Sequence, residues 1–196
     1  MHKYLIAAAL LIAPPAYGAE EPDHAIHQEL RVVLSTVETA INDAKFDEML
    51  PVISQDIRAT TINQEVISSR DEVTGYFNRW FGPGGYLKKL HMSLHPDDLT
   101  ELSDDKSWGL VRGSGVEAYT LADGRVFDML TRWTAVMQKD ADGKWRLRSI
   151  HIGTNFLDNP ILAAAKGALR NVGLAAGSGG VLAGGILGFL FGRRKK

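Results

Sequence analysis

The sequence of 196 residues contains no cysteine. Disulfide bonds, thiol nucleophiles and zinc–thiolate sites are therefore excluded. Neither sign of charge dominates, since the formal net charge is −1. However, five of the 22 basic residues lie near the two ends, namely Lys3 and the last four residues. The rest of the chain has 17 basic and 23 acidic residues, a net charge of −6. A body this acidic argues against nucleic acid as a partner.

Several chemical signatures are also missing from the sequence. It has no glycine-rich phosphate loop, no nucleotide fingerprint and no Ser–His–Asp order. His91 and His95 share one face of a predicted strand, but no third ligand can be placed beside them. We therefore predict no metal and no cofactor. The hydrophobic content of 45% and charged content of 23% are those of one globular domain with appendages, and exclude a disordered, collagen or coiled-coil chain.

The N-terminal segment has the pattern of a secretory signal. His2 and Lys3 form a basic start, and ten apolar residues follow from Tyr4 to Ala13. Two prolines then break any helix, and Gly18 or Ala19 offers a small residue for cleavage. An uncleaved anchor is the alternative, but a span needs about 20 apolar residues. We predict a signal peptide over residues 1–19 and a linker over 20–25.

The C-terminal segment is apolar over a greater length. Residues 174–191 carry no charge and are followed by Arg-Arg-Lys-Lys. This length just spans the hydrocarbon core of a bilayer, and the positive-inside rule keeps the basic end in the cytoplasm. We predict a linker or juxtamembrane helix over 157–173, a transmembrane helix over 174–192 and a cytoplasmic tail over 193–196. The location that follows is the bacterial inner membrane, with the domain in the periplasm.

Glycines recur at every fourth position of this apolar segment, at Gly180, Gly184, Gly188 and Gly192. On a helix they form one face, which lets two backbones approach closely, as in small-xxx-small membrane contacts. The interpretation is a self-associating membrane helix. Two alternatives are a flexible glycine-rich tail and a bacterial sorting tail that is cut off.

The region between the two ends is predicted to be one α+β domain that begins with helices. Apolar residues at three- and four-residue spacing predict a long amphipathic helix over 25–44. A short second helix over 46–53 and a strand over 57–62 follow. Ser69 is the expected N-cap of a third helix, which ends at Gly82-Pro83-Gly84-Gly85.

The rest of the domain is predicted to be a four-stranded antiparallel meander. Two Asp-Gly pairs, at Gly124 and Gly143, predict hairpin loops between the last three strands. Long runs rich in β-branched and aromatic residues mark the strands. Their ranges are 87–94, 108–121, 125–139 and 144–156.

This order of elements, together with three short motifs, resembles the SnoaL-like branch of the nuclear transport factor 2-like superfamily over residues 26–156. The motifs are Asp47 with Leu50 after the first helix, Arg132-Trp133-Thr134-Ala135-Val136, and Asp142-Gly143-Lys144-Trp145 followed by His151. Gly153 departs from the pattern, because the family often has serine there. The resemblance implies a cone-shaped, cystatin-like fold with three N-terminal helices on a curved sheet and a pocket between them. It also implies dimerisation through the sheet in many members, and leaves the activity open between isomerases, hydratases, cyclases and non-catalytic binders.

Strand alternation selects the candidate catalytic residues. Trp145, Leu147, Ser149 and His151 are expected on one face, which we assign to the cavity. His151 is the first candidate acid–base residue, because imidazole titrates near neutral pH. Asp128 and Glu117 are the candidate carboxylates. The inward face of the strand that carries Glu117 stays open, because Gly113-Ser114-Gly115 could host a bulge.

Aromatic residues supply a candidate ligand pocket. It consists of Tyr76, Trp80, Tyr119, Trp133 and Ser149. Plain core packing is the alternative role for the aromatic residues. Two functions follow: a non-catalytic, homo-oligomeric module that binds a small apolar ligand or a protein partner, or an isomerase- or hydratase-type enzyme that uses His151 with Asp128 or Glu117. The lack of a dense polar cluster favours the first.

Overall fold

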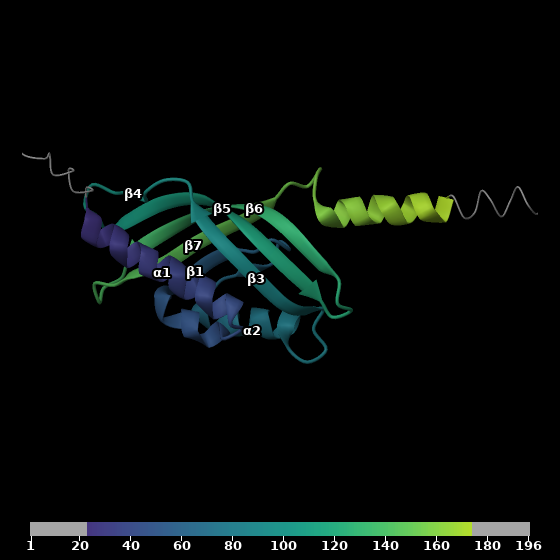
Figure 1. The fold of residues 1–196 in the computed structure, drawn as a ribbon. Helices are drawn as coiled ribbons and strands as arrows, with labels where there is room; N and C mark the ends of the chain where they lie inside the picture. Colours follow the sequence, from purple (N-terminus) through teal and green to yellow (C-terminus); the bar gives the residue numbers. More distant parts are fainter. Residues whose placement is uncertain (1–22, 174–196) are drawn as a thin grey trace, which may run out of the picture.

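A computed structural model describes residues 23–173 (Figure 1). The elements follow in the order α1 (His24–Asn42), a 3₁₀ helix η1 (Phe46–Val52), β1 (Ile53–Thr60), β2 (Val66–Ile67), α2 (Arg70–Phe81), β3 (Leu87–Pro96), β4 (Glu101–Leu102), β5 (Trp108–Leu121), β6 (Val126–Lys139) and β7 (Trp145–Thr154). The helices α1 and α2 lie on one side of a curved sheet (Figure 1). The α+β prediction is confirmed, except that the second of the three helices is 3₁₀.

The helix α1 forms because its apolar residues repeat at helical spacing. Leu30, Val33 and Ile41 are buried against the sheet, whereas Val32, on the opposite side, is 60% exposed. The helix ends at Asn42, two residues before the predicted end, and Ala44 then has a positive φ of 56° that turns the chain away. The Asn42 side chain also bonds both backbone groups of Met92, which fixes the helix end to β3.

The meander of β3, β5, β6 and β7 is confirmed, and it extends into a larger sheet. Its strand order is β2-β1-β7-β6-β5-β3, with the short β4 paired to β5. Both predicted Asp-Gly loops are present, with Gly124 at φ 89° and Gly143 at φ 79°. Glycine adopts these left-handed values without steric cost, which explains its place in both loops. Trp145, which follows the second loop, is buried.

The first strand differs from its prediction in start and direction. β1 begins at Ile53 instead of Ile57, because η1 ends at Val52 and the chain extends directly from it. It runs parallel to β7, so the sheet is mixed and not wholly antiparallel. Arg146 of β7 reinforces this junction, since its Nε donates to the backbone oxygen of Pro51 at 3.0 Å.

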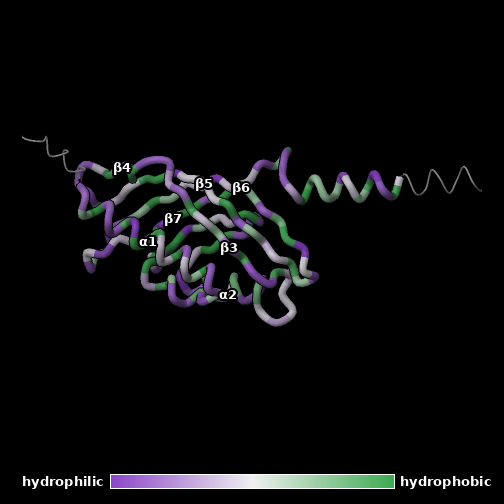
Figure 2. Tube along the Cα trace, viewed as in Figure 1, coloured by the Kyte–Doolittle hydropathy of each residue, from purple (hydrophilic) through white to green (hydrophobic). Residues whose placement is uncertain are grey.

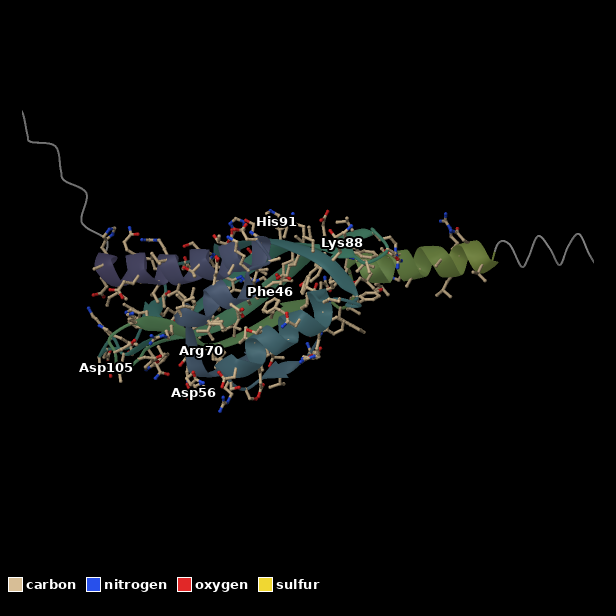
Figure 3. The ribbon with its side chains drawn as sticks, turned by 90° about the horizontal axis from the view of Figure 1, so that it is seen from below. Phe46, Asp56, Arg70, Lys88, His91 and Asp105 are labelled. Atoms are coloured by element: carbon tan, nitrogen blue, oxygen red, sulfur yellow. The ribbon has the colours of Figure 1, made fainter. Side chains whose placement is uncertain are left out.

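The helices η1 and α2 close one end of the cone through aromatic packing. The ring of Phe46, labelled in Figure 3, stacks on Phe77 with centroids 4.3 Å apart. Phe81 adds a tilted contact to both rings. Ser69 holds the predicted N-cap position of α2, although its side chain makes no capping hydrogen bond.

Residues 160–173, the last that the structure describes, are helical and project away from the domain (Figure 1). Among residues 23–173, no helix is long and apolar enough to cross a membrane. The predicted transmembrane helix over 174–192, its glycine row and the signal peptide over 1–19 all lie outside the described residues.

Candidate functional site

A cavity of about 510 Å³ lies between α1 and the concave face of the sheet. Its walls come from α1 between His27 and Val37, from the end of β3 with the segment that follows it, and from the middle of the sheet. Apolar side chains dominate them. They include Leu30, Leu34, Val37, Leu94, Val111, Trp133, Ala135, Met137, Leu147 and Ile150.

Four polar residues complete the lining of this outer cavity. Arg31 and Asp98 are exposed and stand where the cavity meets solvent, with Thr100 beside them. The fourth is His27, which is only 6% exposed. His27 was not among the predicted site residues, although its spacing of three from Leu30 puts both on the buried face of α1.

A second, smaller cavity of about 130 Å³ continues from the first toward α2. The two share part of their lining, namely Val37, Leu94, Trp133, Leu147 and Ile150. The inner cavity is also mostly apolar. It differs in containing Glu117 and two tyrosines, Tyr76 and Tyr119. The cone therefore holds an apolar outer chamber and an inner chamber with a polar end.

Trp133 lines both chambers. It is 5% exposed, and its indole nitrogen donates to the backbone oxygen of Ser114 at 3.0 Å. Gly113 faces the indole across the strand pair, and a Cβ there would collide with the ring. The absence of a side chain at Gly113 therefore creates the space for Trp133, a predicted pocket residue that the structure places in the lining.

The polar end of the inner chamber is a three-residue cluster around Glu117. The β5–β6 register runs without a bulge, so Glu117 and Tyr119 both face the cavity. The Tyr119 hydroxyl donates to Glu117 Oε2, and the Thr131 hydroxyl donates to Oε1 at 2.8 Å. Gly115 makes room for this contact, since a Cβ there would lie 2.6 Å from the Thr131 hydroxyl. Glu117 itself is only 2% exposed.

Burial controls the protonation of this cluster. It raises the pKa of the Glu117 carboxyl, and the two donated hydrogen bonds offset only part of that rise. Burial also raises the pKa of the Tyr119 hydroxyl, and the neighbouring carboxylate adds to the shift. The pKa of Tyr76 is raised as well, again chiefly by burial. The chamber thus favours neutral forms of all three groups.

Trp80 and Ser149, two of the predicted pocket residues, line neither cavity. Trp80 lies on the outer side of α2, where its indole donates to Glu65 Oε1 at 2.8 Å. The Ser149 hydroxyl donates to the backbone oxygen of Arg58 on β1 at 2.8 Å. Tyr76, Tyr119 and Trp133 are the three that the structure brings together at the cavities.

His151 lies on the outer face of the sheet and is exposed. The expectation that it shares a face with Trp145 is wrong, because the β6–β7 register shifts between Val136 and Met137. The shift places an extra residue, Arg148, on β7 and reverses the alternation after it. Ile150 and Ile152 consequently face the cavities in place of Ser149 and His151.

Asp128 of β6 is likewise exposed on the outer face, where it pairs with Ala118 of β5. The nearby arginines have other partners: Arg132 pairs with Asp97, and Arg112 with Glu101 at 3.6 Å. Of the three candidate catalytic residues, Glu117 alone faces the interior. The structure therefore does not bring His151 and a carboxylate together in one cavity.

Within residues 23–173, no group of three or more histidine or acidic side chains gathers closely enough to hold a metal ion. His91 is exposed at the edge of the sheet (Figure 3). His95 is also exposed and contacts the Ser93 hydroxyl at 3.1 Å.

The helices, the curved sheet and the internal cavity together define the cone-shaped fold called nuclear transport factor 2-like or cystatin-like. Among solved structures, the chain is similar to a ketosteroid isomerase-like protein from Erwinia carotovora atroseptica, with 15% identity and a TM-score of 0.55, covering 65% of this chain and 94% of the other. A second similar structure is a hexachlorocyclohexane dehydrochlorinase, LinA-type3, from Novosphingobium barchaimii, with 10% identity and a TM-score of 0.56. The match covers 67% of this chain and 88% of the other. A third is an uncharacterized protein with a cystatin-like fold from Caulobacter vibrioides, with 18% identity and a TM-score of 0.53. The match covers 73% of this chain and 96% of the other.

No family model matches the sequence, and no curated protein matches it. Identities this low show a shared fold alone. The printed names of these neighbours include a dehydrochlorinase and an isomerase-like protein.

Proposed function

We propose that this protein is a non-catalytic, membrane-anchored periplasmic module that binds a small apolar ligand inside its cone. The observation that carries the proposal is the apolar outer chamber of about 510 Å³. Its size falls within the roughly 300–1,000 Å³ of small-molecule sites, which are mostly apolar with few polar groups. A core that served stability alone would be filled, because voids cost packing energy.

The inner chamber supports a ligand with one neutral polar end. A molecule that extends past Trp133 meets Glu117, whose raised pKa favours the protonated acid. A neutral hydroxyl or carbonyl group could exchange hydrogen bonds with this acid and with the tyrosines. A carboxylate would be less suitable, because burying an unpaired anion beside an acid is costly.

The cellular location rests on the sequence at the two ends. The signal pattern over 1–19 and the uncharged run over 174–191 before the basic tail support export and retention in the inner membrane. The test is to fractionate cells that produce the full chain or a chain without residues 174–196. The full chain should stay with membranes after a carbonate wash, and the shortened chain should not.

The proposal includes self-association of the chain through the outer face of the sheet. A different protein that binds the same face is the alternative. The outer face of the sheet supports it, since Val116 and Leu130 form a cross-strand pair there with 45% and 72% exposure. The glycine row of the predicted anchor adds a second surface. Native mass spectrometry of the detergent-extracted protein would show the oligomer and any ligand that co-purifies.

Filling the outer chamber tests the binding proposal. Ala135 is buried and lines that chamber, so Ala135→Phe should occupy it and weaken binding of a neutral apolar dye such as N-phenyl-1-naphthylamine. Thr134→Phe is the matched control, because Thr134 is the adjacent, exposed residue. Equal dye binding by both folded variants would contradict the proposal.

One observation favours a second candidate, an acid–base enzyme of the isomerase or hydratase type. Glu117 is a buried carboxyl with a raised pKa and hydrogen bonds from Tyr119 and Thr131, and perturbed carboxyls in cavities are characteristic of catalytic sites. The two candidates differ in what Glu117→Gln should do. With the co-purified ligand in D₂O, an enzyme would exchange ligand C–H protons and Glu117→Gln would abolish the exchange. The binding module would show no exchange with either protein.

A further inference from the structure

The helix over 160–173 begins at a well-defined cap. The Asn159 side chain accepts a hydrogen bond from the Leu162 backbone nitrogen at 2.9 Å, and Pro160 occupies the first helical position. Both features are typical of helix N-termini. Asn159 also donates to the backbone oxygen of Asn155 at 3.0 Å, which joins the cap to the end of β7. The helix therefore starts at a position that local contacts determine.

This helix carries a concentration of exposed apolar side chains. Leu169 is 73% exposed, Val172 67% and Ile161 57%, and Phe156 and Leu157 just before the helix are 84% and 76% exposed. Within residues 23–173, no other part of the domain covers these side chains. Exposed apolar side chains gathered on one helix are suited to contact with another surface.

The exposed side chains divide into two faces. Ile161, Ala165, Leu169 and Val172 follow one another at spacings of three or four and form one apolar face. Lys166 borders it beside Leu169, and Arg170, one turn further on, lies on the side of the helix that carries Ala163. Figure 2 shows the resulting change between hydrophobic and hydrophilic segments along the helix.

Charge indicates which surface this face would meet. No acidic residue occurs after Asp158, whereas the helix has two basic ones and the chain ends in four more. Basic residues beside an apolar helix face are typical of helices that lie in the interface of anionic membranes. The next segment along the chain, 174–191, is uncharged and apolar.

We propose that helix 160–173 lies flat in the interface of a bilayer that contains anionic lipids. Its apolar face enters the boundary of the acyl chains. Lys166, at the edge of that face, contacts lipid phosphates, and Arg170 reaches them only by extending its long side chain toward the headgroups. The helix then holds the cone at the membrane surface at a set distance, with the cap at Asn159 as the connection. This inference rests on the membrane location in the proposed function, but not on any ligand of the cone.

The absence of cysteine allows a direct test with the full-length chain. Leu169→Cys on the apolar face and Ala163→Cys on the opposite face would each carry an NBD fluorophore. Leu187→Cys would report on the predicted anchor. The labelled proteins would be reconstituted into phosphatidylcholine vesicles with or without phosphatidylglycerol, and lipids with a doxyl group near the headgroup would serve as quenchers.

We expect several-fold stronger lipid quenching at position 169 than at 163, with a further increase from phosphatidylglycerol. Lys166→Glu with Arg170→Glu should remove that increase. Lys88→Glu with Lys89→Glu, the same charge change on exposed residues of β3, should not (Figure 3 labels Lys88). Quenching at 187 without any difference between 163 and 169 would overturn the flat helix while leaving the anchor intact. Shielding of 169 from iodide without lipid quenching would mean that a protein covers the face, and would also overturn the proposal.

Discussion

The outer and inner chambers of the cone share five lining residues but differ in chemistry. The outer one is apolar except near its mouth and at His27, whereas the inner one ends in Glu117, Tyr119 and Tyr76. The difference arises from one strand, because β5 contributes Val111 to the outer chamber and a carboxyl with a phenol to the inner chamber. A single sheet can thus supply both volume for an apolar ligand and a polar end that distinguishes among ligands.

Removal of Trp133 should have the largest effect on this arrangement. Trp133→Ala should merge the two chambers and lower the free energy of unfolding by about 3–5 kcal/mol, as for other buried aromatic residues. Trp108→Ala is the matched control, because Trp108 is 49% exposed at the start of β5. Denaturant unfolding of both variants checks this. Similar losses of unfolding free energy in the two would contradict the prediction that Trp133 packs in the interior.

The space beside Thr131 should be the next most sensitive feature. Gly115→Ala puts a Cβ where it meets the Thr131 hydroxyl, so the bond to Glu117 must shift. We expect a loss of about 1–3 kcal/mol, the usual cost of overpacking. Gly153→Ala on β7 meets no atom within 4 Å and should be close to neutral. If thermal or denaturant unfolding gave the two variants equal stability, the close packing at Gly115 would be refuted.

The raised pKa of Glu117 predicts a specific dependence of stability on pH. The folded protein keeps a proton that the unfolded chain releases above the usual value of 4.5, so stability falls as pH rises until it passes the folded pKa. The slope is at most about 1.4 kcal/mol per pH unit. Glu117→Gln lacks this proton, so its stability relative to the wild type should increase as the pH rises from 4.5 to the folded pKa. Unfolding curves between about pH 4 and pH 8 would show it, and parallel pH profiles would argue against a buried, protonated acid.

The smallest effect is expected at the outer face. His151→Ala should change stability by no more than about 0.5 kcal/mol, because exposed side chains away from packed contacts contribute little. Dye binding in the outer chamber should also be unchanged. A several-fold loss of binding would mean that His151 reaches the cavity, and would return it to the candidate site.

Local signals made much of the fold predictable. The apolar spacing of α1, the two Asp-Gly loops and the run of β-branched residues in β5 each act over a few neighbouring residues, so their elements could be located without other information. The limits of β5, 108–121, agree with the structure, as does the N-cap position of α2. The resemblance in motifs supplied the cone, and the solved neighbours support it.

The sequence by itself determined the elements, their order and the residue types available for a site. The tertiary structure decided which of those residues meet. The unbroken β5–β6 register turned Glu117 inward, the extra residue on β7 turned His151 outward, and packing of α1 against the sheet buried His27. Each of these outcomes depends on pairing between segments far apart in the chain, because a shift of one residue in register exchanges the two faces of a strand. Periodicity within one segment carries no information about that pairing.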